Sequence, residues 1–169
     1  VNLGTVGVTG ALSVTSGTTI SDSSTITVGG AATFVTDVND IDIILNNTNA
    51  ITGALTFTTQ TGGSNGADIT LNNGSTAISL AAFTTEGNLT LETTNAIALT
   101  GHTVNGNLSV TSAGAITQSA ALTVSGTSSF TGTGTDTNIT LTQANAFTGS
   151  VTLTTAGTSG DVSIDNNTT

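Results

Sequence analysis

The amino-acid sequence predicts an all-β protein that folds as one parallel β-helix, or β-solenoid, of about eight short coils without helices. Three observations support this prediction. The chain repeats itself at a long fixed offset, apolar and hydroxyl side chains alternate in short runs, and no stretch shows the 3.6-residue period of a helix. Self-similarity at a long period is typical of stacked repeat proteins, so the functional question becomes what a rod does.

The repeat is visible by direct comparison. Residues 8–16, VTGALSVTS, return as residues 104–112, VNGNLSVTS, which sets an offset of 104 − 8 = 96. Apolar positions downstream keep this offset, as when Phe34 matches Phe130. The register changes only at a three-residue indel, after which Ile69 matches Val162 at 93.

The domain organisation follows from this comparison. We interpret residues 1–169 as a single solenoid segment in which residues 6–75 and 102–169 are two copies of one repeat. Both ends lack the charged capping segments that close natural solenoids, so we expect each end to continue into further coils.

The strands are short and alternate strictly. Apolar side chains face one side and hydroxyls the other, as in Leu12-Ser-Val14, Ile26-Thr-Val28, Leu89-Thr-Leu91 and Ile139-Thr-Leu141. Most junctions are too long for two-residue hairpin turns, and without helices parallel strands can follow one another only by coiling. The 96-residue offset then corresponds to four coils of about 24 residues or five of about 19.

Glycine and asparagine mark the expected corners, because both tolerate left-handed backbone conformations. Residues 49–51, 95–97 and 145–147 read Asn-Ala-Ile, Asn-Ala-Ile and Asn-Ala-Phe. We expect one recurring corner at these sites, with the asparagine at the bend and the apolar residue turning inward.

Composition restricts the partners. The chain has ten acidic residues, no lysine or arginine and a net charge of −10. It therefore cannot neutralise phosphates or an anionic lipid surface, and we expect no nucleic-acid or membrane binding. The absence of cysteine excludes a disulfide framework.

Residues 67–73, 106–118 and 138–149 resemble the repeat regions of filamentous-haemagglutinin-like exoproteins of bacteria. These are adhesins of two-partner secretion and related autotransporter passengers. The resemblance covers nearly the whole chain in composition and rhythm, and it implies a right-handed parallel β-helix shaft on the outside of a cell. The secretion domain of that family, with its Asn-Pro-rich signature, has no counterpart in a chain without proline.

The densest group of metal-ligating side chains is Asp37, Asn39, Asp40 and Asp42, whose oxygens suit Ca²⁺. The group does not fit an EF-hand loop, and of its acidic residues the second copy keeps only Asp136, opposite Asp40. We therefore expect a solvated corner with no bound metal or other cofactor. Residues 62–68 loosely resemble a calcium-binding glycine repeat, but we interpret them as a plain turn.

His102 is the single histidine, and it stands where the first copy has Val6. A lone histidine without a nearby nucleophile, second base or cation is more often structural than catalytic. Polysaccharide-cleaving β-helices need clustered carboxylates together with Lys or Arg, which this chain does not supply. We expect no catalysis.

Threonines form outward-facing pairs that a flat solenoid face could present to ice. The pairs are Thr25/Thr27, Thr56/Thr58, Thr140/Thr142 and Thr152/Thr154. The variation in coil length and the interruption by Ser, Asp and Glu92 make β-propensity and solubility the simpler explanation. Asn-x-Ser/Thr triplets, such as those at Asn88, Asn107 and Asn138, could accept glycans or arise by chance.

The sequence thus predicts a structural, non-catalytic shaft or spacer of a bacterial extracellular adhesin or surface fibre. The alternative is a subunit of a self-assembling extracellular filament. Ice or glycan binding and a polysaccharide-active β-helix remain as other possibilities. The expected partners are further coils or subunits end to end, and a host or neighbouring cell reached through other parts of the parent chain.

Overall fold

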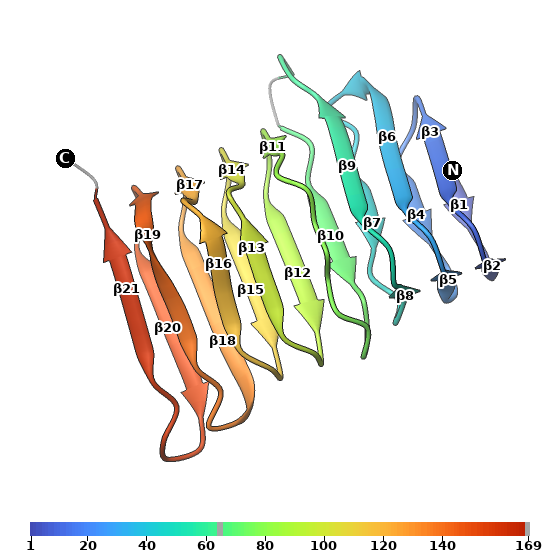
Figure 1. Ribbon diagram of the computed structural model, residues 1–169. Helices are drawn as coiled ribbons and strands as arrows, with labels where there is room; N and C mark the ends of the chain where they lie inside the picture. Colours follow the sequence, from blue (N-terminus) through green and yellow to red (C-terminus); the bar gives the residue numbers. More distant parts are fainter. Residues whose placement is uncertain (64–65, 168–169) are drawn as a thin grey trace.

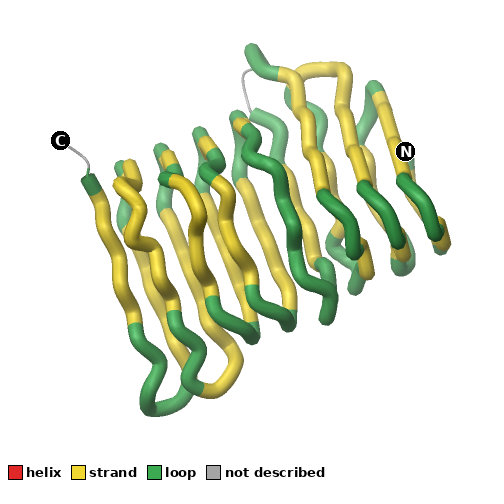
Figure 2. Tube along the Cα trace, viewed as in Figure 1, coloured by secondary structure: helices red, strands yellow, loops and turns green. Residues whose placement is uncertain are grey.

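A computed structural model describes residues 1–63 and 66–167, in which all secondary structure is β (Figures 1 and 2). The strands are β1 (Asn2–Leu3), β2 (Val6–Val8), β3 (Leu12–Ser16), β4 (Ile20–Asp22), β5 (Ile26–Val28), β6 (Ala32–Asn39), β7 (Ile43–Leu45), β8 (Ala50–Ile51), β9 (Leu55–Gln60), β10 (Ile69–Asn72), β11 (Thr84–Thr85), β12 (Leu89–Thr93), β13 (Ile97–Thr100), β14 (Thr103–Val104), β15 (Leu108–Ser112), β16 (Ile116–Ala120), β17 (Thr123–Val124), β18 (Ser128–Thr135), β19 (Ile139–Phe147), β20 (Val151–Ala156) and β21 (Val162–Asn166).

Five parallel sheets run along the axis of the coil (Figure 1). Sheet A takes one strand from each coil, in the order β1-β4-β7-β10-β12-β15-β18-β20. Sheets B (β2-β5-β8) and C (β3-β6-β9) complete the N-terminal half. Sheets D (β13-β16-β19-β21) and E (β11-β14-β17-β19) complete the C-terminal half and share the long strand β19. The eight strands of sheet A confirm the predicted β-solenoid of about eight coils.

Coil length varies along the rod. The register pairs Asn2 with Ser21 (21 − 2 = 19) and Ile43 with Ile69 (69 − 43 = 26), which bracket the coils on sheet A. In the N-terminal half the extra residues lie in the loops from sheet C back to sheet A, and in the C-terminal half they lie in the loop from β18 of sheet A to β19 of sheet D. The stacked strands therefore stay in register. A coil can therefore lengthen at its corner without disturbing the ladder.

The two sequence copies lie on opposite sheets, which the sequence did not predict. Strands β3, β6 and β9 form sheet C, whereas their counterparts at an offset of 96, β15, β18 and β20, lie in sheet A. Isolated bridges from Leu55 to Leu80 and from Ile78 to Ile97 link sheet C to sheet D. The offset therefore equals four coils plus a crossing to the opposite sheet, and the expectation of four or five whole coils was wrong.

The crossing has a local cause. After each of the sheet A strands β1, β4 and β7, the chain makes a short strand and then a long strand before it returns to sheet A. After β10 it omits both and runs directly through residues 73–77 to the Ile78–Leu80 segment, which repeats the Ile69-Thr-Leu71 pattern nine residues later (78 − 69 = 9). Because these two strands are missing, every later strand lies half a coil away from the position of its counterpart in the first copy.

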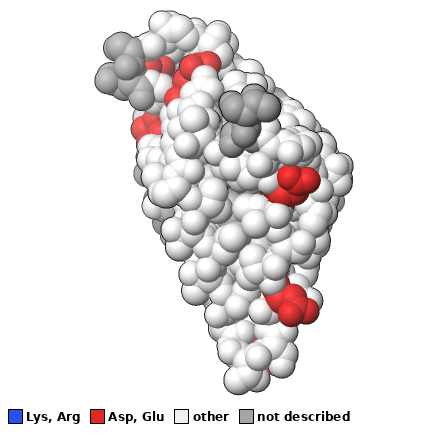
Figure 3. Space-filling model, turned by 90° about the vertical axis from the view of Figure 1, so that its left-hand side faces the viewer, with Lys and Arg blue, Asp and Glu red and all other residues white. Residues whose placement is uncertain are grey.

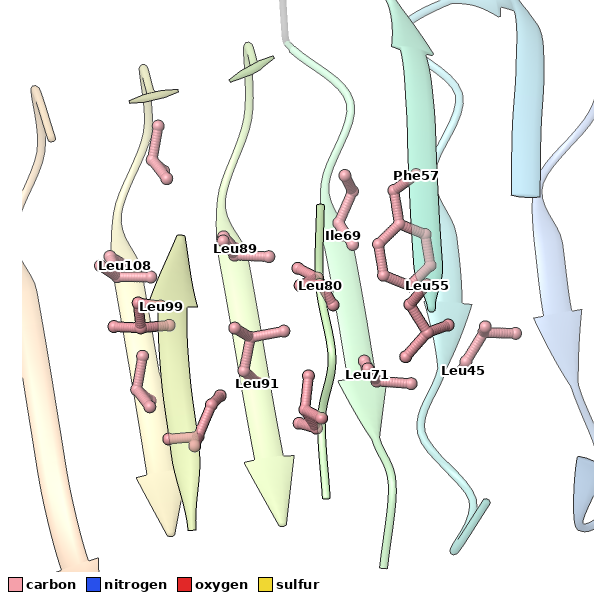
Figure 4. Close-up of a cluster of buried hydrophobic side chains, with 14 of the residues drawn as sticks. Leu45, Leu55, Phe57, Ile69, Leu71, Leu80, Leu89, Leu91, Leu99 and Leu108 are labelled. Atoms are coloured by element: carbon pink, nitrogen blue, oxygen red, sulfur yellow. The ribbon is translucent and has the colours of Figure 1, made fainter. Parts of the chain in front are cut away.

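Apolar columns fill the interior between sheet A and the opposite sheets (Figure 4). Leu45, Leu71 and Leu91 follow one another on sheet A, and each is fully buried. Phe34 stacks on Phe57 of the next coil with ring centroids 5.8 Å apart. Side chains in one column lie one interstrand spacing apart, so buried apolar side chains contact each other from coil to coil and form a closely packed core.

Glycine columns stand where a short strand turns into a long one. A Cβ on Gly106 would lie 2.6 Å from the carbonyl oxygen of Gly87, and a Cβ on Gly126 would lie equally close to that of Gly106. These glycines do not adopt positive φ, so close approach of the coils, rather than the left-handed conformation we expected, requires them.

The apolar residue that follows each predicted Asn corner, Ile51, Ile97 or Phe147, is buried as expected. At two of the three corners the asparagine also turns inward, which the sequence did not predict. Asn49 Oδ1 accepts from Ile26 N at 2.8 Å, and Asn145 Oδ1 accepts from Leu122 N at 2.9 Å. Both side chains are buried, and both donate to the backbone carbonyl four residues earlier, that of Leu45 or Leu141. The amide thus completes the backbone ladder where the strand is interrupted.

Asn95 lies at a bend and is followed by the buried Ile97, but its own side chain differs from the other two. It is exposed, and its Oδ1 accepts from the adjacent Ala96 N. Its segment crosses from sheet A to sheet D, whereas Asn49 precedes the short strand β8 of sheet B. Asn145 lies within β19, just before the residues that pair with β17 in sheet E. At that corner the buried Thr93 hydroxyl donates instead to the carbonyls of Gly74 and Thr76.

We predict that Asn145→Ala destabilises the chain by about 2–4 kcal/mol, because it leaves the backbone N–H of Leu122 and the backbone C=O of Leu141 without this buried hydrogen-bond partner. Asn95→Ala, an identical substitution in the same local sequence, should cost less than about 1 kcal/mol. Urea unfolding followed by circular dichroism measures both. Equal losses would contradict the assigned geometry.

Candidate functional site

The four candidate metal ligands turn toward different neighbours. Asp40 Oδ1 accepts from Gly66 N at 3.0 Å, and Asp42 Oδ1 accepts from Asp68 N at 2.9 Å. Asp37 lies near Gly17 of the preceding coil, while Asn39 pairs with Gln60 of the next. Among the described residues, no group of three or more acidic or histidine side chains is arranged to hold a metal ion. Two of the 62–68 residues lie outside the described part of the chain.

Asp40 and Asp136 share a backbone role that explains why the acid recurs. Both adopt left-handed conformations, with φ of 58° and 56°, at positions 96 residues apart. Asp136 Oδ1 accepts from Thr158 N and Ser159 N, as Asp40 Oδ1 accepts from the next coil. Aspartate adopts the left-handed conformation more readily than most residues. Because these carboxylates accept from N–H groups of the next coil, they also hold the long loops in place.

A ladder of Asx side chains leads into sheet A. Asp68 Oδ1 accepts from Asn88 N at 2.7 Å, Asn88 Oδ1 from Asn107 N at 2.8 Å, and Asn107 Oδ1 from Thr127 N at 2.8 Å. Asn138 makes the same bond to Asp161 N. The three predicted glycan-acceptor asparagines therefore all bond the backbone of the following coil.

The sequence comparison missed Asp22, the most deeply buried carboxylate. Asp22 is only 8 % exposed and points inward in the column of Leu45. Its oxygens accept from the backbone N–H groups of Asn46 and Asn47 and from the side-chain amides of Asn47 and Asn49, the last at 2.7 Å. Amide donors alone therefore satisfy this buried charge.

The second copy carries the same network without the charge. Gln118 stands 96 residues after Asp22 (118 − 22 = 96), and its Oε1 accepts from Asn145 Nδ2 at 3.0 Å. Its Nε2 donates to Asn145 Oδ1 at 2.8 Å. The conversion of a carboxylate to an amide in an equivalent place indicates a structural rather than a chemical role for Asp22.

His102 ends an aromatic column inside the rod. Phe57 contacts Phe83, and Phe83 contacts the imidazole with ring centroids 4.7 Å apart. The histidine is 1 % exposed, and within the part of the chain that the structure describes neither ring nitrogen has a hydrogen-bond partner. Burial lowers the pKa of His102 from 6.5 to about 4. The imidazole is therefore neutral at pH 7 and packs as an apolar ring.

The four predicted threonine pairs point outward but lie on four different sheets. Thr25/Thr27 belong to sheet B, Thr56/Thr58 to sheet C, Thr140/Thr142 to sheet D and Thr152/Thr154 to sheet A. They do not form one array.

A different set lines up on the outer face of sheet A. One column reads Thr70, Thr90, Ser109, Ser129, Thr152, and the other Asn72, Glu92, Thr111, Thr131, Thr154. The columns are in register despite the unequal coils, but Asn72 and Glu92 interrupt the run of hydroxyls.

Acidic side chains form separate patches on the face drawn in Figure 3, which shows no basic group. No pocket is found among residues 1–63 and 66–167. In the same residues, no helix is long and apolar enough to cross a membrane.

This geometry places the chain among the parallel β-solenoid repeat proteins. The model of a family described as repeats of unknown function (DUF5649) matches residues 1–58 and 86–154, which is most of the chain. The chain therefore belongs to this family. No curated protein and no solved structure matches it.

We predict that His102→Phe stabilises the chain more at pH 5 than at pH 7.5. With a pKa near 4 folded and near 6.5 unfolded, the histidine takes up its proton mainly when unfolded, so stability falls as pH drops from 6.5 to 4. At pH 5 this costs about 2 kcal/mol, which the variant does not lose. Urea unfolding of both proteins at the two pH values measures the difference in their free energies of unfolding. Both proteins have the same carboxylates, so the effect of carboxylate titration cancels in this difference. A pH-independent difference would show that the imidazole is solvated or paired.

Proposed function

We propose that this chain is a structural, non-catalytic shaft segment that spaces other parts of a bacterial extracellular adhesin or surface fibre. The observation that carries the proposal is the unbroken register of sheet A. Its strands pair in parallel from β1 to β20, across loops of very different length. A chain whose strand pairing is maintained while its loops vary in length is suited to act as a spacer between other parts of a protein.

The contacts of the polar side chains support the same role. The side chains that would otherwise suggest sites, Asp22, Asp40 and His102, are occupied by amide donors, backbone N–H groups or aromatic packing. Their partners belong to neighbouring coils in each case. These groups therefore join coils to one another, as the parts of a shaft must.

Surface composition supports an exposed location. The charged side chains are all acidic, apart from the single histidine, which is buried. A net negative surface keeps protein rods soluble and apart at high density. Together with the resemblance to filamentous-haemagglutinin-like repeats, this favours the outside of a bacterial cell as the site of action.

A spacer should tolerate loss of one whole coil. We predict that deletion of residues 89–107, which joins Asn88 to Leu108, leaves a folded and shorter rod, because Leu89 and Leu108 are register partners. The length should fall by about 4.8 Å, one interstrand spacing. Small-angle X-ray scattering and circular dichroism measure length and fold.

The matched control removes residues 89–98, about half a coil, and should misalign the ladder and lower cooperativity. If the whole-coil deletion unfolds the chain as severely as the half-coil deletion, coils are not interchangeable spacers.

Location can be tested separately. Antibodies raised against the folded chain should label intact cells of the source organism without permeabilisation. Labelling that appears only after permeabilisation would contradict an extracellular shaft.

A further inference from the structure

Around the crossing at residues 73–77, continuous strand pairing joins the described coils on one side of the rod only. On that side, sheet A passes from β7 through β10 to β12 without a break. On the opposite side, single bridges from Leu80 to Leu55 and from Ile78 to Ile97 hold residues 78–83 between β9 and β13 (Figure 4). Sheet B ends at β8 and sheet E begins at β11, so neither passes through the crossing. The coils can therefore part here on one side while they stay joined on the other.

Residues 78–83, which we call the bridging segment, bury little apolar side chain. Ile78 and Leu80 are buried, but Ala81 and Ala82 are exposed and Phe83 is only partly buried. A segment with few buried apolar contacts and few ladder bonds opens at a lower free energy than the rest of a structure. The bridging segment should therefore be the first part of the interior to separate.

Buried polar atoms without a hydrogen-bond partner gather on the coils that bound this segment. Four such side-chain atoms occur among the described residues, and three of them are Thr59 Oγ1 on β9 and the two ring nitrogens of His102. Phe83 links the two places, because its ring contacts Phe57 of β9 and also the imidazole. Opening of the segment gives these atoms water as a partner, which offsets part of the cost of opening.

His102 stands in an otherwise apolar column. The register of β14 with β11 and β17 places it between Phe83 and Leu122. The equivalent residues of the first copy are Val6 and Ile26 (102 − 96 = 6 and 122 − 96 = 26), which are register partners far from the crossing. The repeat thus carries a titratable side chain in this column only on the coil that follows the crossing.

The described elements packed around the imidazole bring no charged side chain to it. The elements without an acidic residue are residues 55–60, 78–85, 97–104 and 116–124. Asp68 and Glu86 accept from asparagine side chains of the next coil, and Glu92 is exposed on the outer face of sheet A. Burial alone lowers the pKa of His102 to about 4, so no carboxylate holds a proton on the imidazole in the closed chain.

We propose that the crossing is an acid-operated opening point of the rod. Protonation of His102 places a charge beside Phe83 without an acceptor, so the bridging segment leaves β9 and water reaches the imidazole. Sheet A keeps its pairing and holds the two halves together. The proton comes from solvent and returns to it when the pH rises, which makes the opening reversible. This behaviour is independent of the proposed shaft role.

Acid favours the open form. A group whose pKa is about 4 when buried and 6.5 when solvated binds its proton more readily in the open form. The open form therefore gains as the pH falls from 6.5 to 4, and it gains nothing further below that. Between pH 7.5 and pH 5 the ratio of open to closed chains should rise roughly thirtyfold.

Amide hydrogen exchange followed by NMR tests the opening in the whole chain. Leu55 N and Ala81 N form the bonds between β9 and the bridging segment, and Ile69 N, which bonds Asn88 O across sheet A at the same level, is the matched reference. After correction for intrinsic rates, the two reporters should be less protected than Ile69 N and should depend little on urea. Their protection should fall roughly thirtyfold between pH 7.5 and pH 5. Equal protection and equal urea dependence of all three amides would mean that the chain opens only as a whole, which overturns the proposal.

His102→Val tests the trigger, because it restores the residue of the first copy and keeps every carboxylate. The reporters of this variant should lose the thirtyfold response, and circular dichroism at pH 7.5 checks that the variant folds. A response that persists in the variant assigns the opening to other groups and overturns the role of His102. NMR titration of the wild-type imidazole needs no variant, and a pKa of 6.5 in the closed chain would equally overturn it.

Discussion

The structure depends on one constraint, which is that each coil must satisfy its backbone N–H and C=O groups on the coils above and below it. No helix within the described residues provides internal hydrogen bonds, so the parallel register between coils has to hold along the whole rod. The corners are where strands stop and the ladder would fail. At the corners, side chains replace the missing backbone acceptors. Asn145 Oδ1 accepts from Leu122 N, and Asp136 Oδ1 accepts from the N–H groups of Thr158 and Ser159. Glycine is required at other corners because the coils approach too closely for a Cβ.

Much of the fold could be predicted from sequence because a strand's side-chain period is two and the repeat offset is long. Alternation fixes which side chains face inward, and the columns of Leu45, Leu71 and Leu91 confirm it. Alternation does not fix the sheet to which a strand belongs, because the inward pattern is the same on opposite sheets. The half-coil crossing at residues 73–77 was therefore not predicted, although two apolar pairs only nine residues apart, at Ile69 and Ile78, were a signal of it.

The corner and site residues show where local sequence stops being informative. Asn95 and Asn145 both precede Ala and an apolar residue, yet only Asn145 turns inward, because the two segments join different sheets. Asp22 was missed because its partners Asn47 and Asn49 lie a full coil away in sequence. A comparison of whole copies would have found it, since Asp22 with Asn49 and Gln118 with Asn145 keep the same offset. The aromatic partner of His102, Phe83, could not be predicted from the local sequence, because the contact depends on how the coils stack.

The same constraint explains how a rod whose charged surface side chains are all acidic can be stable. Carboxylates such as Asp40 and Asp42 accept N–H groups from the next coil, so several negative charges are held by the ladder rather than by cations. Coiling also pairs the strands of each sheet with those of the coils before and after, so away from the crossing the sides of the rod present no open strand edge within the described residues. Like charge along the sides opposes lateral association between rods.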